Sequence, residues 1–289
     1  MKILYISNIG LPPTFPHEDY LNDCVFHGFR TLFGSDCVDV AKNESMYKGA
    51  TDGNRDKMYG KGFTLYGLLD DISVDRTDIE SKIKHKNFDF VVYGQVTRSR
   101  PYIQLVNEHY PRKKIIMLDG EDETHFNTQY RDMSVFFKRE LNVPDEKIHP
   151  ISFCIPSDLL IKKCPTKTQM FAGTPTNKHV YITEAPYYEE YQRSYFGITH
   201  KKAGWDCLRH YEILMNRCIP YFRDIYQLPE RTMTHFPIDL VKRGMKLINQ
   251  EKPDDELYGI IDNHLYTHMV KNLTTTAMAN YVIRTAWRQ

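Results

Sequence analysis

Short apolar runs alternate along this chain with stretches in which apolar residues recur at helical spacing. Runs rich in β-branched and aromatic residues, typical of strands, occur at residues 2–7, 37–40, 88–94 and 114–120. Between the first two runs, Asp19 precedes Leu21, Val25, Phe29 and Leu32, which share one face of a predicted helix. This alternation is typical of a parallel sheet covered by helices, so the sequence predicts an α/β fold.

The second half of the chain repeats the alternation after a proline-rich stretch at residues 141–168, which interrupts regular structure. Beyond it, strands are predicted at residues 170–173, 180–183, 195–199 and 219–222, and helices at 203–218 and 274–288. We therefore predict two lobes, at residues 1–150 and 151–289. Residues 43–62 are polar and have no clear period, which is typical of an excursion or a mobile loop, and they are left without an assigned element.

Composition narrows the class of protein. Hydrophobic residues make up 41% of the chain and charged residues 26%, which excludes collagen-like, disordered and coiled-coil proteins. The 38 basic residues balance 37 acidic ones, so the whole molecule does not attract nucleic acid or acidic membranes at long range. We expect a protein without a membrane span, since no apolar run reaches the ~18–20 residues that cross a bilayer. The chain starts without a signal-peptide pattern, which predicts a cytoplasmic location, the host cytoplasm if the gene is viral.

Metal chemistry has little support in the sequence. The six cysteines form no Cys-x-x-Cys pair and have no histidines at zinc spacing. Reduced and mostly buried thiols are the expected outcome. We therefore predict no metal site.

Residues 195–214 form the most informative segment. A strand leads through Lys201 and Lys202 into a predicted helix that starts at Ala203. Backbone N–H groups at a helix start hold phosphate well, and the two lysines add positive charge beside it. Glu212 follows about two turns further along the helix, and its carboxylate can accept hydrogen bonds from both hydroxyls of a ribose. This spacing matches a nucleoside diphosphate.

The same residues carry a resemblance to a known family. The pattern Arg209-x-x-Glu212-x-Leu214-x-x-x-Cys218-Ile219-Pro220 resembles the donor-site motif of exostosin-like and related GT-B glycosyltransferases. The resemblance extends more weakly to residues 19–20, 61–66 and 119–122, which are similar to small bacterial and viral relatives. It implies two Rossmann-like lobes around a cleft, with the nucleotide-sugar on the second lobe and the acceptor facing the first.

The resemblance also implies residue roles. Glu212 would bind ribose, and Arg209, Lys201 and Lys202 would contact the diphosphate. Arg217 stands where the family usually has glycine, which places a further cation toward the donor. The predicted donor-binding set is Ser194, Thr199, Lys201, Lys202, Gly204, Trp205, Arg209, Glu212 and Arg217. The alternative is that Arg209 and Glu212 form an ordinary surface pair and that Trp205 only packs.

Acidic residues follow the strand at 114–120. Asp119, Glu121 and Asp122 lie where ligands bind in open α/β sheets, beyond the carboxyl ends of the strands. One of them, with Asp119 as the first choice, would deprotonate the acceptor hydroxyl or stabilise charge at the sugar carbon. A turn or capping cluster is the alternative. His17 and Asp19, after the first strand, are further catalytic candidates.

The acceptor side is predicted at Gly94, Gln95 and Arg98, which follow the strand at 88–94. The predicted activity is transfer of a hexosyl or pentosyl unit from a nucleoside diphosphate sugar, such as a UDP-sugar, with no other cofactor and no required metal. The acceptor is a glycan, a small molecule or, in a virus, a hydroxymethylated DNA base. Two alternatives stay open: a catalytically silent protein that binds nucleotides or glycans, and a metal-dependent GT-A-like transferase. The oligomeric state is open as well.

Overall fold

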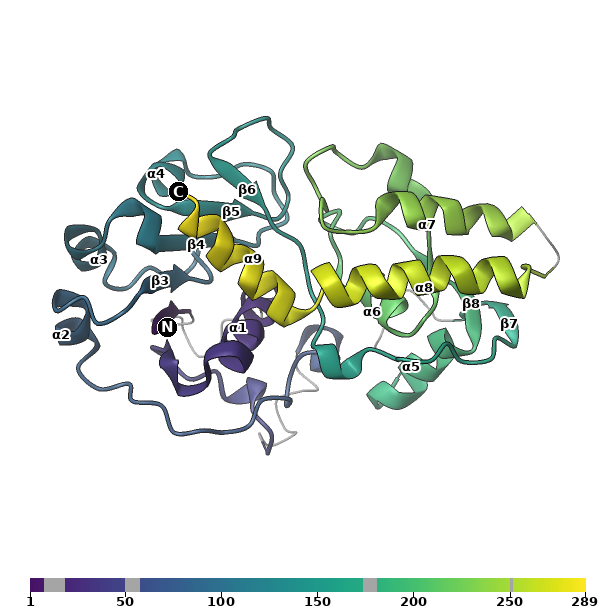
Figure 1. Ribbon diagram of the computed structural model, residues 1–289, viewed down its shortest axis with the longest axis horizontal. Helices are drawn as coiled ribbons and strands as arrows, with labels where there is room; N and C mark the ends of the chain where they lie inside the picture. The colour runs from purple at the N-terminus through teal and green to yellow at the C-terminus, as the bar shows by residue number, and fades with distance from the viewer. Residues whose placement is uncertain (8–18, 50–57, 174–180, 250–251) are drawn as a thin grey trace.

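The computed structural model describes residues 1–7, 19–49, 58–173, 181–249 and 252–289 (Figure 1). The candidate His17 lies outside the described residues. Within them the fold is α/β, with two separate parallel sheets and helices packed on them. This confirms the predicted class, while the division at residue 150 and a cleft between two lobes stay predictions.

The larger sheet has six parallel strands in the order β2-β1-β3-β4-β5-β6. Their bounds are β1 Ile3–Ile6, β2 Cys37–Asp39, β3 Phe90–Tyr93, β4 Ile115–Asp119, β5 Val135–Lys138 and β6 Ile148–Pro150. The first four match the predicted runs, whereas β5 and β6 were not predicted. The chain steps from β1 outward to β2 and then to the other side of β1, so the strand order reverses between β1 and β3.

Both faces of this sheet are buried, because side chains of a strand alternate between its two faces. Ile3 and Tyr5 belong to one hydrophobic cluster, and Leu4 and Ile6 to another. The helices near this sheet are α1 Tyr20–Phe33, α2 Ile79–Lys84, α3 Ile103–His109 and α4 Thr128–Met133. Residues of α1 pack in the first cluster, and residues of α2, α3 and α4 in the second.

The smaller sheet has three parallel strands in the order β7-β8-β9. These are β7 Gln169–Phe171, β8 Ser194–Thr199 and β9 Ile219–Phe222, and they match three predicted strands. The helices of this part are α5 Glu184–Gln192, α6 Leu208–Met215, α7 Ile238–Met245 and α8 Asp255–Asn272. The predicted strand at 180–183 is wrong over its described part, since residues 181–183 form no strand and lead through a bend into α5.

The last helix, α9 Thr275–Trp287, returns to the larger sheet and packs on α1 (Figure 1). The two helices approach so closely at Gly28 that an ideal Cβ there would lie 2.0 Å from the carbonyl oxygen of Thr275. Only glycine fits this contact. The linker between the sheets is bound to the same region, because Ile155 exchanges backbone hydrogen bonds with Leu273 and Thr275. Among the described residues, no helix is long and apolar enough to cross a membrane.

Candidate functional site

Asp119 is the last residue of β4 and pairs in register with Lys138 at the end of β5. The ammonium group of Lys138 lies 2.8 Å from Asp119 Oδ1, and both side chains are buried. The backbone N–H of Glu121 also donates to Oδ1, at 3.1 Å. Among the described residues, every hydrogen bond to this carboxylate ends on Oδ1, so Oδ2 is the oxygen left for a ligand.

Glu121 is held by two side chains from the loop after β3. Arg98 Nε donates to Glu121 Oε1 at 2.9 Å, and Thr97 Oγ1 donates to the same oxygen at 2.8 Å. Burial alone would raise the pKa of Glu121, but these hydrogen bonds outweigh it and lower the pKa. Glu121 is therefore an ion-paired carboxylate and a poor proton acceptor.

Asp19 belongs to the same group of charges. It caps the start of α1 by accepting a hydrogen bond from the backbone N–H of Asn22. Burial raises the pKa of Asp19, and the guanidinium of Arg98 opposes that shift. Asp19, Arg98 and Glu121 thus meet beside the point where the strand order reverses, which is where open α/β sheets bind ligands.

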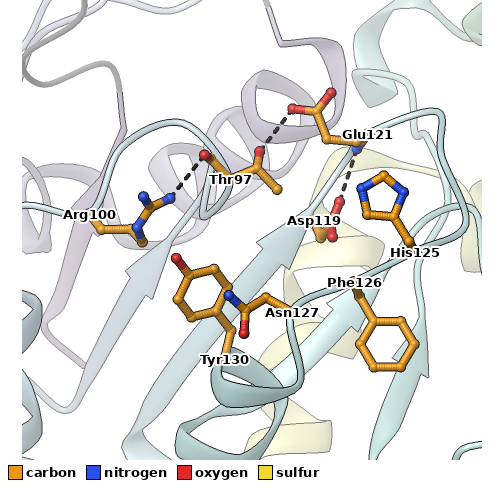
Figure 2. Close-up of a pocket in the computed structure, with 8 residues that line it drawn as sticks. All are labelled: Thr97, Arg100, Asp119, Glu121, His125, Phe126, Asn127 and Tyr130. Carbon is orange, nitrogen blue, oxygen red and sulfur yellow. Dashed lines mark hydrogen bonds between the residues drawn. The ribbon is translucent and has the colours of Figure 1, made fainter.

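A cavity of about 240 Å³ opens between the loops that follow β3 and β4 (Figure 2). Its lining residues are Thr97, Arg100, Asp119, Glu121, His125, Phe126, Asn127 and Tyr130. Small-molecule pockets commonly have volumes of ~300–1,000 Å³, so this one suits a single ring or part of a larger ligand. Two predicted catalytic residues, Asp119 and Glu121, therefore share a cavity.

Gly94 and Gln95 follow β3 and position the loop that carries Arg98. An ideal Cβ on Gly94 would lie 1.8 Å from Asn22 Oδ1, so the position is restricted to glycine by packing. The carbonyl of Gln95 accepts the backbone N–H groups of Arg98 and Ser99 and forms the turn that carries Arg98. Of the predicted acceptor residues, Arg98 bonds to a predicted catalytic carboxylate, that of Glu121.

The basic loop after β8 carries Lys201 and Lys202. Lys201 Nζ lies 5.3 Å from the ring of Trp205, which is a cation–π contact. Lys202 Nζ lies 3.2 Å from the hydroxyl of Tyr59, a residue of the first half of the chain. Lys201 is exposed and Lys202 is half-buried. Both are in reach of an anion from solvent.

Helix α6 begins later than predicted, at Leu208 rather than at Ala203. Residues 200–207 are a loop, so Gly204 and Trp205 precede the helix. Glu212 consequently lies ~6 Å along the helix axis from its first residue, not two turns away. Arg209 is buried in the first turn.

The carboxylate of Glu212 is completely buried, with 0% of the residue exposed. Tyr187 donates a hydrogen bond to Oε2 at 2.8 Å, and Thr64 donates to Oε1 at 2.5 Å. The reading of Arg209 and Glu212 as a surface pair is therefore wrong, because both side chains are buried. The ribose-binding role requires Thr64 to leave Oε1, since Tyr187 already occupies Oε2. The sequence did not predict Tyr187 or Thr64 as partners of Glu212.

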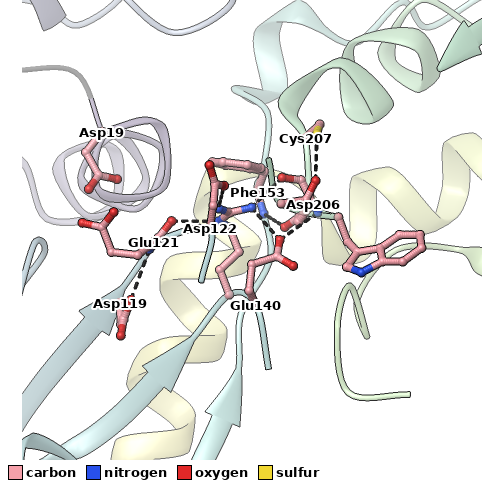
Figure 3. Close-up of polar contacts among 12 residues, drawn as sticks. Asp19, Asp119, Glu121, Asp122, Glu140, Phe153, Asp206 and Cys207 are labelled. Atoms are coloured by element: carbon pink, nitrogen blue, oxygen red, sulfur yellow. Dashed lines mark hydrogen bonds and ion pairs between the residues drawn. The ribbon is translucent and has the colours of Figure 1, made fainter. Parts of the chain in front are cut away.

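Figure 3 shows Asp122 and Glu140, from the loops after β4 and β5, close to Asp206 in the loop before α6. The residue that links these loops is Arg139, directly after β5. Its guanidinium donates to the carbonyls of Gly120 and Asp206 and pairs with Asp122 and Glu140. Glu140 also accepts the backbone N–H of Asp206 at 2.9 Å. The carboxyl ends of β4 and β5 are thereby joined to the loop between β8 and α6.

Asp206 and Gly204 complete this contact. Asp206 accepts hydrogen bonds from Tyr211 and from the backbone N–H of Phe153, and burial raises its pKa to about 6. An ideal Cβ on Gly204 would lie 2.6 Å from Glu140 Oε1, so Gly204 is a packing residue. Arg139, Glu140 and Asp206 were not predicted, although a charged Lys-Arg-Glu run directly after a hydrophobic strand was a usable signal.

Ser194 and Thr199 lie at opposite ends of β8, about 17 Å apart at strand rise. Ser194 Oγ donates to the carbonyl of Glu190, far from the lysines. Thr199 Oγ1 bonds to Nδ1 of His210, a buried histidine whose pKa burial lowers to about 3. Ser194 therefore does not belong with the other predicted donor-binding residues, because it lies at the amino end of the strand.

Arg217 was predicted to face the donor, but its side chain is bound to α8. Its backbone has φ 58°, a left-handed conformation that glycine adopts freely. Its buried guanidinium contacts Asp262 at 2.7 Å, and it also bonds Asn263 on α8 and the carbonyl of Lys162. The charge is used to fasten α8 to the turn before β9. We do not carry Arg217 forward as a donor-binding residue.

Within the described residues, no group of three His, Cys, Asp or Glu side chains is arranged to hold a metal ion. The six cysteines, all in described segments, are free thiols. Comparison with protein-family models, with curated proteins and with solved structures found no match to this chain. Its function is therefore inferred from its residues and their geometry.

Proposed function

We propose that this protein is a nucleotide-sugar-dependent glycosyltransferase of the two-lobed GT-B type. The observation that carries the proposal is the junction at Arg139, where loops after β4 and β5 meet the loop between β8 and α6. Ligands of parallel α/β sheets bind beyond the carboxyl ends of the strands. A junction that brings two such ends together suits a reaction between two substrates.

The donor side of this proposal is the loop after β8. Lys201 and Lys202 supply positive charge for a diphosphate, and the backbone N–H groups at the start of α6 lie at the end of the same loop. Arg209, in the first turn, adds a buried guanidinium close to Glu212. Stabilising the departing diphosphate is the main contribution we expect from these charges.

The acceptor side is the cavity that contains Asp119. Oδ2 of Asp119 takes the proton of an acceptor hydroxyl while Lys138 and the N–H of Glu121 hold Oδ1. The hydroxyl oxygen then bonds to the anomeric carbon of the donor sugar as the bond from that carbon to the diphosphate breaks. Burial raises the pKa of Asp119, against the opposing charge of Lys138, which favours a proton-accepting role over a permanently ionised one.

A panel of nucleotides and nucleotide-sugars, with and without divalent metal, tests the donor side by thermal shift, since ligand binding raises apparent stability. We expect at least one nucleoside diphosphate to stabilise the protein, and Lys201→Ala and Lys202→Ala to reduce that shift. Lys271→Ala, an exposed lysine on α8, is the matched control.

Sugar release in the presence of acceptors then separates an enzyme from a silent binding protein. Binding without turnover of any donor favours the silent protein. Equal thermal shifts in wild type and both lysine variants would remove the donor site from this loop.

A further inference from the structure

Residues Met58–Tyr66, here called the 58–66 segment, cross from the first half of the chain to the donor side. Thr64 Oγ1 lies 2.5 Å from Glu212 Oε1 and 2.7 Å from the hydroxyl of Tyr188. Tyr59, at the other end of the segment, bonds to Lys202. The segment therefore contacts two residues of the predicted donor site, Glu212 and Lys202. The contact with Glu212 is a hydrogen bond from the hydroxyl of Thr64 to the carboxylate.

Two residues of this segment have an unfavourable backbone conformation. Lys61 and Thr64 have φ values of 56° and 81°, whereas the neighbouring Gly60 and Gly62 adopt positive φ freely. A left-handed conformation is an outlier for a β-branched residue such as Thr64. Backbone strain of this kind persists only where surrounding contacts over-determine it, and it clusters at functional sites.

Several contacts with the second half of the chain hold the strained segment in place. The backbone N–H of Thr64 donates to Glu184 Oε1 at 2.7 Å, and Lys61 Nζ donates to the carbonyl of Tyr181 at 2.8 Å. Phe63 packs in a small hydrophobic cluster with Ala172, Tyr187, Tyr191, Ile213 and Cys218. The segment is thus held by one apolar contact, that of Phe63, and by several polar contacts. A bound ligand could replace the polar contacts.

The chemistry of these polar contacts matches that of a nucleotide. A ribose hydroxyl would donate to the carboxylate of Glu212 as the hydroxyl of Thr64 does. A phosphate oxygen would accept from Lys202 where the Tyr59 hydroxyl now lies. The carboxylate is wholly buried, with Thr64 on Oε1 and Tyr187 on Oε2. A ribose hydroxyl can therefore bind Oε1 only when Thr64 leaves it.

We propose that the 58–66 segment is an internal competitor of the donor nucleotide, and that the nucleotide binds by displacing Thr64 from Glu212. This inference rests on the proposed function. If the segment competes in this way, the donor site is closed in the free protein. Donor binding then requires movement of a segment from the acceptor half of the chain. Strain in the segment favours its release once a ligand replaces its hydrogen bonds.

The test is nucleotide affinity in Thr64→Val, which keeps the shape of the side chain but removes the hydroxyl. Loss of a hydrogen bond to a charged group weakens the competitor, so the Kd for UDP or GDP, measured calorimetrically, should fall about ten-fold. Thr64→Ser keeps the hydroxyl and should bind as wild type does. Thr77→Val removes an exposed hydroxyl of the same half and should change nothing.

Hydrogen exchange provides a second readout that does not depend on the variants. Amides of residues 63–66 should exchange faster when UDP or GDP is bound to the wild-type protein. An unchanged or higher Kd in Thr64→Val, or slower exchange of these amides with nucleotide, would overturn the inference and make the segment a permanent part of the donor site.

The two proposals fail differently. If wild type binds a nucleotide through Lys201 and Lys202 and Thr64→Val binds no tighter, the donor site stands and the competition is wrong. If neither wild type nor Thr64→Val binds any nucleoside diphosphate, both proposals are wrong.

Discussion

The guanidinium of Arg139, directly after β5, donates a hydrogen bond to the backbone carbonyl of Asp206, directly before α6. One buried side chain thus joins the carboxyl edge of the larger sheet to the loop that carries the lysines. Because Arg139 also holds Asp122 and the carbonyl of Gly120, it connects the loops after β4 and β5 to this contact. Predictions about this junction therefore test the site as a whole.

Gly204→Ala should disturb the junction directly. The added methyl group would lie within 3 Å of Glu140, Asp122 and Arg139, whose side chains are fixed by one another. Overpacking of this kind costs ~1–3 kcal/mol of the free energy of unfolding, measurable by urea denaturation. Gly259→Ala in α8 is the control, because a Cβ there meets nothing within 4 Å. That change should stabilise the protein by ~0.5–1 kcal/mol. Equal stability of Gly204→Ala and wild type would mean that the loops pack less closely.

Asp119→Asn should remove the proton acceptor while keeping one hydrogen bond, because the amide oxygen still accepts from Lys138. It also removes the ion pair with the buried Lys138, so the free energy of unfolding should fall as well. We expect kcat for sugar transfer to fall ~10²–10⁴-fold with little change in the Kd of the donor. Glu123→Gln, an exposed neighbour in the same loop, serves as the comparison and should keep full activity. Transfer at the wild-type rate by Asp119→Asn would exclude this carboxylate as the base.

Arg217→Gly should destabilise the protein without affecting nucleotide binding. Glycine relieves the left-handed backbone by ~1 kcal/mol, but Asp262 is then buried without its guanidinium partner, which costs ~3–5 kcal/mol. The net loss in the free energy of unfolding should be ~2–4 kcal/mol by urea denaturation, and adding Asp262→Asn should recover part of it. A higher Kd for nucleotide with an unchanged free energy of unfolding would show that Arg217 contributes to the donor site.

Asp23 should give the protein a pH-dependent stability. Burial raises its pKa from 3.8 to about 7, although hydrogen bonds from Tyr66 and Asn22 oppose the shift. Between about pH 4 and pH 7 the folded chain keeps a proton that the unfolded chain releases, so stability falls as the pH rises through this window. Asp23→Asn lacks that slope.

The measurement is the free energy of unfolding of Asp23→Asn minus that of wild type, taken at several pH values. This difference should rise by a few kcal/mol between pH 4 and pH 7, since each pKa unit corresponds to ~1.4 kcal/mol. The buried histidines His27, His210 and His235 titrate in both proteins and cancel in the difference. A flat difference would show that Asp23 is ionised throughout.

Local pattern was enough to predict most of the strands. Residues of β1 and β3 are apolar over their whole length, and β4 is apolar up to Asp119, its last residue. Such a composition is typical of a strand that is buried on both faces. The position of Asp119 at a carboxyl edge followed from the same pattern. Strands β5 and β6 were not predicted. Only three apolar residues of β5 precede the charged run at 138–140, and β6 has three residues that end in proline, so both resemble loop segments in isolation.

By itself, therefore, the sequence determined the α/β class, most of the strands and the acidic edge after β4, since each depends on residues close together in the chain. Only the tertiary structure decided that Thr64 covers Glu212, that Arg139 reaches Asp206 and that Arg217 serves α8. Thr64 and Glu212 are 148 residues apart, and their contact depends on how the two sheets and their loops pack together. No local spacing encodes such a distance, because it is set by the packing of the whole chain.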